Sequence, residues 1–114
     1  MSKTPMLTAS EARGRASNDR VIFDECRSIE SAILDSVDMG GYETFVIDGT
    51  TMTNISVGRD VAMSYYATWV GVDTDRAKTI QMNAVISYFT NLGYSIERRL
   101  NSTTHDTFIW YVVW

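Results

Sequence analysis

His105 is the only histidine in the chain, and Asp106 follows it directly in a polar stretch, 101–106, that is typical of a turn. A carboxylate beside an imidazole can orient the ring as a general base. Together with Arg98, such a pair could serve a small hydrolase or a nucleotide-handling enzyme. The only nucleophiles that the sequence suggests nearby are hydroxyl groups of the same turn, so the pattern favours a surface histidine over a catalytic one.

The cysteine and the acidic residues do not form the pattern of a metal site or a disulfide. Cys26 is the only cysteine, which excludes a disulfide within the chain and fits a reducing compartment. It has no second cysteine or histidine at the spacing of a metal site. Asp73 and Asp75 resemble the start of a calcium loop, but the glycine and the later glutamate of that loop are missing. We therefore expect no catalytic, cofactor-binding or metal-ligating residues and no small-molecule substrate.

The charge and hydropathy of the chain argue against nucleic-acid and membrane partners. The net charge is −4, from 14 acidic and 10 basic residues. Arg98 and Arg99, near Tyr94, could offer stacking and phosphate contacts, but they suit a solvated strand face or an interface rim equally well. No run of about 18 apolar residues predicts a membrane span, and residues 1–5 do not resemble a signal peptide.

A long helix, predicted over 8–40 after an N-terminal arm, 1–7, is the first element that could position a site. Thr8 and Glu11 form a capping box at its start, and the glycine pair that follows Met39 suits its end. A break near Asn18 would divide it into two helices. Its basic residues lie early and its acidic residues late, which fits either a solvated face or a docking surface with two oppositely charged ends.

One side of this helix carries an apolar stripe. A helix turns by about 100° per residue, so apolar residues spaced three or four positions apart fall on the same side. Such a stripe packs against the chain's own sheet or serves as an oligomer seam, and the pattern leaves both open. The members are Ile22, Cys26, Ile29 and Ile33, with Val37 beside them.

The rest of the chain is predicted to complete a single α+β domain, 1–114, with a sheet and a second helix over 42–114. The expected architecture is a long N-terminal helix, a second helix, and a small antiparallel sheet that ends in a C-terminal β-hairpin. The elements expected are a strand over 42–48, a strand or helix over 62–70, a helix that is capped within 73–75 and runs to 91 or 92, and strands over 94–100 and 107–114.

The last eight residues, 107–114, carry no charge, glycine or proline and are rich in aromatic and β-branched side chains. The strand is apolar on both faces, with Phe108, Trp110, Val112 and Trp114 on one side and Ile109, Tyr111 and Val113 on the other. An uncovered strand of this kind pairs with other edges and aggregates. A chain of 114 residues has limited material to cover both faces, which predicts assembly with other subunits.

Four segments form a pattern with a recognisable counterpart: 64–71 (SYYATWVG), Asp75-Arg76, 85–98 (VISYFTNLGYSIER) and 107–114 (TFIWYVVW). This pattern resembles small virion structural proteins of tailed bacteriophages, including cyanophages, and the opening 7–13 (LTASEAR) is similar to how such proteins begin. The resemblance implies a non-enzymatic part of the particle that is present in many copies, and it carries no catalytic residue over.

We therefore expect a structural assembly protein in the head, neck or tail of a tailed-phage virion, assembled in the host cytoplasm. Its partners would be other copies of itself and other virion proteins. The alternative is a small adaptor module that recruits a strand or helix of a partner. The residues expected at subunit interfaces are Ile22, Ile29, Ile33, Phe108, Trp110 and Trp114.

Overall fold

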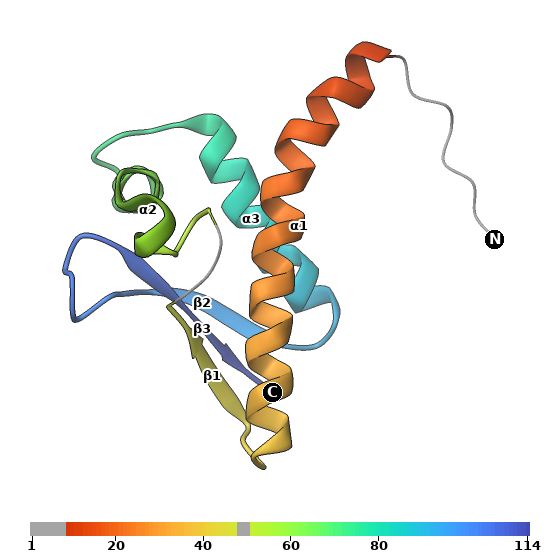
Figure 1. Ribbon diagram of the computed structural model, residues 1–114, viewed down its shortest axis with the longest axis vertical. Coiled ribbons are helices and arrows are strands. Elements are labelled where there is room, and N and C mark those ends of the chain that lie inside the picture. Colours follow the sequence, from red (N-terminus) through yellow and green to blue (C-terminus); the bar gives the residue numbers. More distant parts are fainter. Residues whose placement is uncertain (1–8, 48–50) are drawn as a thin grey trace.

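The part of the chain that the structure describes folds into three helices and a three-stranded antiparallel sheet, shown as a computed structural model in Figure 1. It comprises the backbone of residues 9–47 and 51–114 and the side chains of residues 20–47 and 51–114. The predicted α+β class is confirmed. In chain order the elements are α1 (Ala9–Asp38), β1 (Glu43–Val46), α2 (Ile55–Val70), α3 (Arg76–Asn91), β2 (Ser95–Leu100) and β3 (Phe108–Val113).

The long N-terminal helix is confirmed as α1, and it continues past Asn18 as one helix to Asp38. Its N-terminal end projects beyond the other elements, as the red segment in Figure 1 shows. The capping residue Thr8 and the arm 1–7 lie outside the described residues.

The end of α1 is set by glycine, as the sequence predicts. Gly40 has a φ of 79°, a left-handed conformation that costs glycine little. Its amide donates to the carbonyl of Val37 at 2.9 Å, and the amide of Gly41 donates to that of Ser36 at 2.7 Å. These two bonds satisfy carbonyls that the end of a helix otherwise leaves without a partner.

α2 occupies the segment for which the sequence left strand and helix open. Asn54 caps it, because its side-chain oxygen accepts from the amides of Ser56 and Val57 at 2.9 and 3.1 Å. Non-helical backbone at Gly58 kinks the first turns. The buried residues of α2 recur every third position, which places one face against the core: Ala62, Tyr65 and Thr68.

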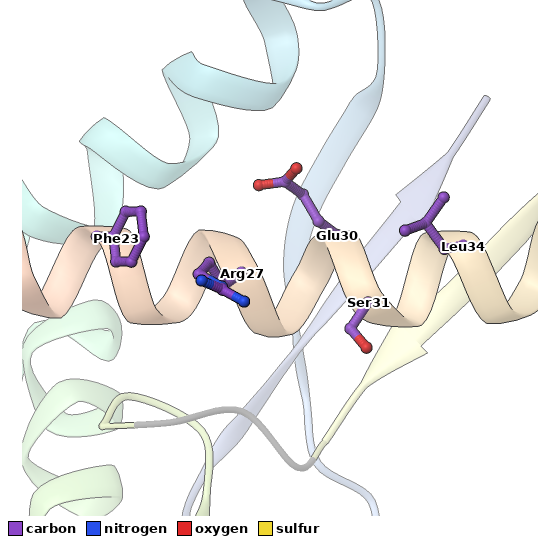
Figure 2. Close-up of a pocket in the computed structure, with 5 residues that line it drawn as sticks. All are labelled: Phe23, Arg27, Glu30, Ser31 and Leu34. Carbon is purple, nitrogen blue, oxygen red and sulfur yellow. The ribbon is translucent and has the colours of Figure 1, made fainter.

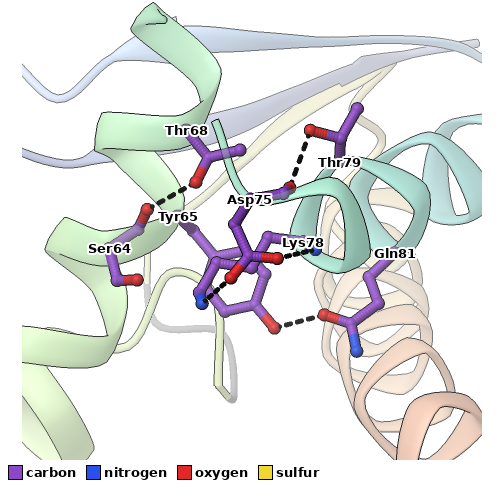
Figure 3. Close-up of polar contacts among 7 residues, drawn as sticks. All are labelled: Ser64, Tyr65, Thr68, Asp75, Lys78, Thr79 and Gln81. Atoms are coloured by element: carbon purple, nitrogen blue, oxygen red, sulfur yellow. Dashed lines mark hydrogen bonds and ion pairs between the residues drawn. The ribbon is translucent and has the colours of Figure 1, made fainter. Parts of the chain in front are cut away.

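α3 begins where the sequence predicts. The carboxylate of Asp75 accepts from the amide of Lys78 at 3.1 Å and pairs with its Nζ at 2.8 Å (Figure 3). The sequence pattern predicts an apolar face made of Ala77, Ala84, Val85, Tyr88, Phe89 and Leu92. This prediction is partly wrong, since Tyr88 and Leu92 are 44% and 59% exposed. The face that is buried consists of Gln81, Met82, Val85 and Phe89.

β3 is the central strand, since the sheet order is β1-β3-β2 and both pairings are antiparallel. Trp110 lies opposite Val46 on β1 and Arg98 on β2, and directly opposed residues share a face. The face that carries Trp110 packs against the helices and joins them in one hydrophobic core. The largest side chains without accessible surface in this core are Trp110, Phe89, Phe108, Ile29, Met52 and Met82.

Candidate functional site

The three groups of the candidate catalytic site have other partners or face solvent. His105 is exposed, on a turn where its own φ is 60°. The carboxylate of Asp106 forms an ion pair with Arg59. The Arg98 guanidinium lies on the inner face of the sheet, 3.3 Å from the sulfur of Met82, and burial lowers its pKa. Asp106 and Arg98 are thus held by contacts that do not include the imidazole.

Among the described residues, Glu25 of α1 is a charged group with no accessible surface. Its Oε2 accepts from Nε1 of Trp110 at 2.8 Å and from the hydroxyl of Thr53 at 3.2 Å. A buried carboxylate needs such donors, because burial without them is costly. These bonds tie α1 to β3 and to the segment before α2. The cluster thus joins three parts of the fold through one buried carboxylate.

A second buried contact joins α2 to α3. The Tyr65 hydroxyl donates to Oε1 of Gln81 at 2.5 Å, and Figure 3 shows this bond beside the Asp75 cap. Burial raises the pKa of Tyr65 to about 12, and the nearby Glu25 carboxylate adds to the shift. Burial likewise raises the pKa of the Cys26 thiol to about 12, which keeps it protonated and unreactive.

Alkaline pH should therefore destabilise the fold. Burial raises the pKa of Cys26 from its ordinary 9.0, and the pKa of Tyr65 from its ordinary 10.0, to about 12 in the folded chain. Their contribution is present in full below the lower values and is lost as the pH rises toward the higher ones. For Tyr65 the loss approaches about 3 kcal/mol above pH 12 and is about half of that at pH 11. Urea unfolding at neutral pH and at about pH 11 would measure it, and an equal free energy of unfolding at both would contradict the expectation.

Within the described residues, no group of three histidine, cysteine or acidic side chains is placed to hold a metal ion. Among the described helices, none combines the length and apolar character that a bilayer crossing requires.

The outer face of the sheet is apolar and accessible. Along β3, side chains without accessible surface alternate with partly buried ones, because successive side chains point to opposite faces. Phe45 and Ile47 of the neighbouring segment are 47% and 43% exposed. We call this surface the outer face and define it by Phe45, Ile47, Ile109, Tyr111 and Val113.

A ladder of side chains crosses the outer face from strand to strand. The ring of Tyr111 stacks on Phe45 with centroids 4.6 Å apart, and the guanidinium of Arg99 lies 3.9 Å from its centroid. The Tyr111 hydroxyl donates to Oε1 of Glu43 at 2.7 Å, and Arg99 pairs with Glu97 at 3.0 Å. These contacts hold the ring of Tyr111 in place within an apolar surface that has a charged margin on β2.

A second accessible apolar surface lies along α1 beside α3. Phe23 and Leu34 are 57% and 62% exposed, and Figure 2 shows them on α1 with Arg27, Glu30 and Ser31. Next to them is a groove of about 110 Å³, lined by Glu30, Ile33, Leu34, Phe89, Leu92 and Tyr94. That volume is below the range of small-molecule sites but admits a side chain.

Four of the six predicted interface residues lie in the chain's own core. Phe108, Trp110 and Ile29 have no accessible surface, and Ile33 keeps 4%. Such side chains have no surface for a neighbour, so their assignment as interface anchors is corrected. Periodicity detects an apolar face but does not say what covers it. The other two are partly buried and pack at the edge of the core, and their contact with a neighbour stays a prediction: Ile22 and Trp114.

Comparison with protein-family models, with curated proteins and with solved structures gave no match to this chain.

Proposed function

We propose that this chain is a non-enzymatic assembly protein that works by packing against other subunits. The observation that carries the proposal is the burial along β3. Phe108, Trp110 and Val112 complete the core, while the equally apolar Ile109 and Val113 keep accessible surface. Apolar surface on a central strand gains stability when a second surface removes it from water.

The outer face has the composition of a subunit interface. Apolar and aromatic side chains form its centre, and charged side chains lie at its margin, in particular Glu97 and Arg99 on the edge strand β2. Tyr111 and Arg99 belong to the residue types that are enriched at interfaces. Two sheets that pack face to face bury such surfaces against each other at a spacing of about 10 Å.

The setting of this assembly is proposed from the resemblance to tailed-phage virion proteins. The chain would be a structural component of the head, neck or tail, assembled in the host cytoplasm, with copies of itself and other virion proteins as partners. A component of this kind needs no active site. The partnered Asp106 and the buried Glu25 are compatible with that role.

An adaptor function is the alternative, and the groove between α1 and α3 is the feature that favours it. Leu34 and Leu92 at the groove are 62% and 59% exposed, and the groove could accept the apolar side chain of a partner helix. A chain that stays monomeric over a wide range of concentrations and binds a partner only transiently would favour this function over assembly.

A pair of lysines on the outer face tests the proposal. Ile109→Lys with Val113→Lys should leave the fold intact, because both side chains are only partly buried, but should oppose packing by placing two charges in the interface. Sedimentation velocity should show association that falls by at least about tenfold. Asn83→Lys, on an exposed position of α3, is the matched control. Association that is equal in both variants would contradict the proposal.

A further inference from the structure

The exposed side of α1 carries a second seam beside the buried one. Phe23, Leu34 and Val37 are 57%, 62% and 48% exposed, with the exposed Arg27 and Glu30 between them. These five positions follow each other at intervals of four and three residues, which is the spacing of a coiled-coil seam. Each residue of the buried stripe directly precedes a residue of this seam in the sequence. α1 therefore has one broad face, of which one half packs in the core and the other half is exposed.

We propose that this seam pairs α1 with α1 of a second copy in an antiparallel arrangement. The proposal rests on the assembly function proposed above and names one of its contacts. In a register with the two-fold axis between positions 28 and 29, Phe23 lies against Leu34 of the other copy, and Arg27 lies against Glu30. Both contacts occur twice, as an interface between identical surfaces requires.

The charges on the seam favour the antiparallel pair over a parallel one. A parallel pair in register would place Arg27 beside its own copy and Glu30 beside its own copy, which sets like charges against each other. The antiparallel pair replaces both repulsions by attractions. In the same register Arg20, which pairs with Asp24 of its own helix at 3.5 Å, lies against Val37 of the other copy and beside the acidic Asp38 that follows it. The charges on the seams of two copies are therefore complementary only when the two helices run antiparallel.

The environment of Glu30 leaves its carboxylate at the surface. Its negative charge raises the pKa of Tyr88 on α3, and the two side chains also share a hydrogen bond. Glu30 is nevertheless exposed and lies at the rim of the groove that contains Leu34 and Leu92. A helix laid on this seam would thus also cover the apolar flank of α3, where Leu92 is 59% exposed.

Cross-linking between two single-cysteine variants tests the register. Phe23→Cys and Leu34→Cys would be treated with a short bis-maleimide, each alone and as a mixture. Cys26 is buried and its raised thiol pKa keeps it unreactive. The mixture should give several-fold more cross-linked dimer than either variant alone, because identical positions lie about 16 Å apart along the axis in this register. Equal yields in all three samples would overturn the proposal.

Charge reversal supplies an independent readout. Arg27→Glu and Glu30→Arg should each weaken self-association at least about tenfold, and the double variant should recover it. Asp35→Arg, on an exposed position outside the seam, is the matched control. A double variant no better than the single ones, in a chain that still forms oligomers, would overturn the α1 pairing and leave the assembly function standing. A chain that is monomeric throughout would overturn both.

Discussion

A chain that ends at Asp106 should not fold. The truncation removes β3, and β3 is the strand to which both β1 and β2 pair. The two edge strands would lose their ladder, and the core would lose Phe108 and Trp110. Since a domain has a net stability of only about 5–15 kcal/mol, loss of a central strand exceeds what the remaining contacts supply. Circular dichroism should show no cooperative thermal transition.

The control for this truncation is a chain that ends at Val113. Trp114 is only partly buried, although its amide donates to the carbonyl of Tyr42 at 3.0 Å. The shorter deletion should therefore keep a cooperative transition at a lower midpoint. If the chain that ends at Asp106 were soluble and unfolded cooperatively, the position of β3 at the centre of the fold would be wrong.

Trp110→Ala should cause the next-largest loss of folding stability. Trp110 has no accessible surface, and truncation of such a side chain costs about 3–5 kcal/mol. Its indole also donates to Glu25 at 2.8 Å, and a buried carboxylate that loses a donor adds about 1–3 kcal/mol. The sum is comparable with the whole stability of a domain. Urea unfolding at neutral pH should show little or no native baseline.

Two variants keep this prediction testable if the alanine variant does not fold. Trp110→Phe keeps a large ring but lacks the N–H, so it should cost about 1–3 kcal/mol. Trp114→Ala, on the same face of the strand but partly exposed, should cost less than Trp110→Ala. A Trp110→Phe chain as stable as the natural one would show that the bond to Glu25 does not contribute to stability.

The helices and strands were largely predictable because local signals mark their ends. Gly40 ends α1 and Asp75 caps α3 as the sequence indicates. Residues 62–70 were ambiguous, because their aromatic and small side chains fit a buried strand as well as a helix. The Asn54 cap, whose side chain accepts two backbone amides, was a local signal for the helix.

The surfaces were less predictable than the elements. The sequence marked β3 as apolar on both faces, but periodicity alone could not tell which face the helices cover. Phe108 and Trp110 lie inside, and the accessible side belongs to Ile109, Tyr111 and Val113. The bond from Glu25 to Trp110 joins residues 85 positions apart, and no local pattern reports a contact at that distance.

The mass of the native species in solution tests the central claim most directly. Sedimentation equilibrium of the unmodified chain over a wide range of concentrations would measure it against the protomer mass of 12.9 kDa. We expect a mass that rises to a multiple of this value as the concentration increases, because the outer face and the α1 seam both present apolar surface. A mass that stays at one protomer at every concentration would contradict self-assembly.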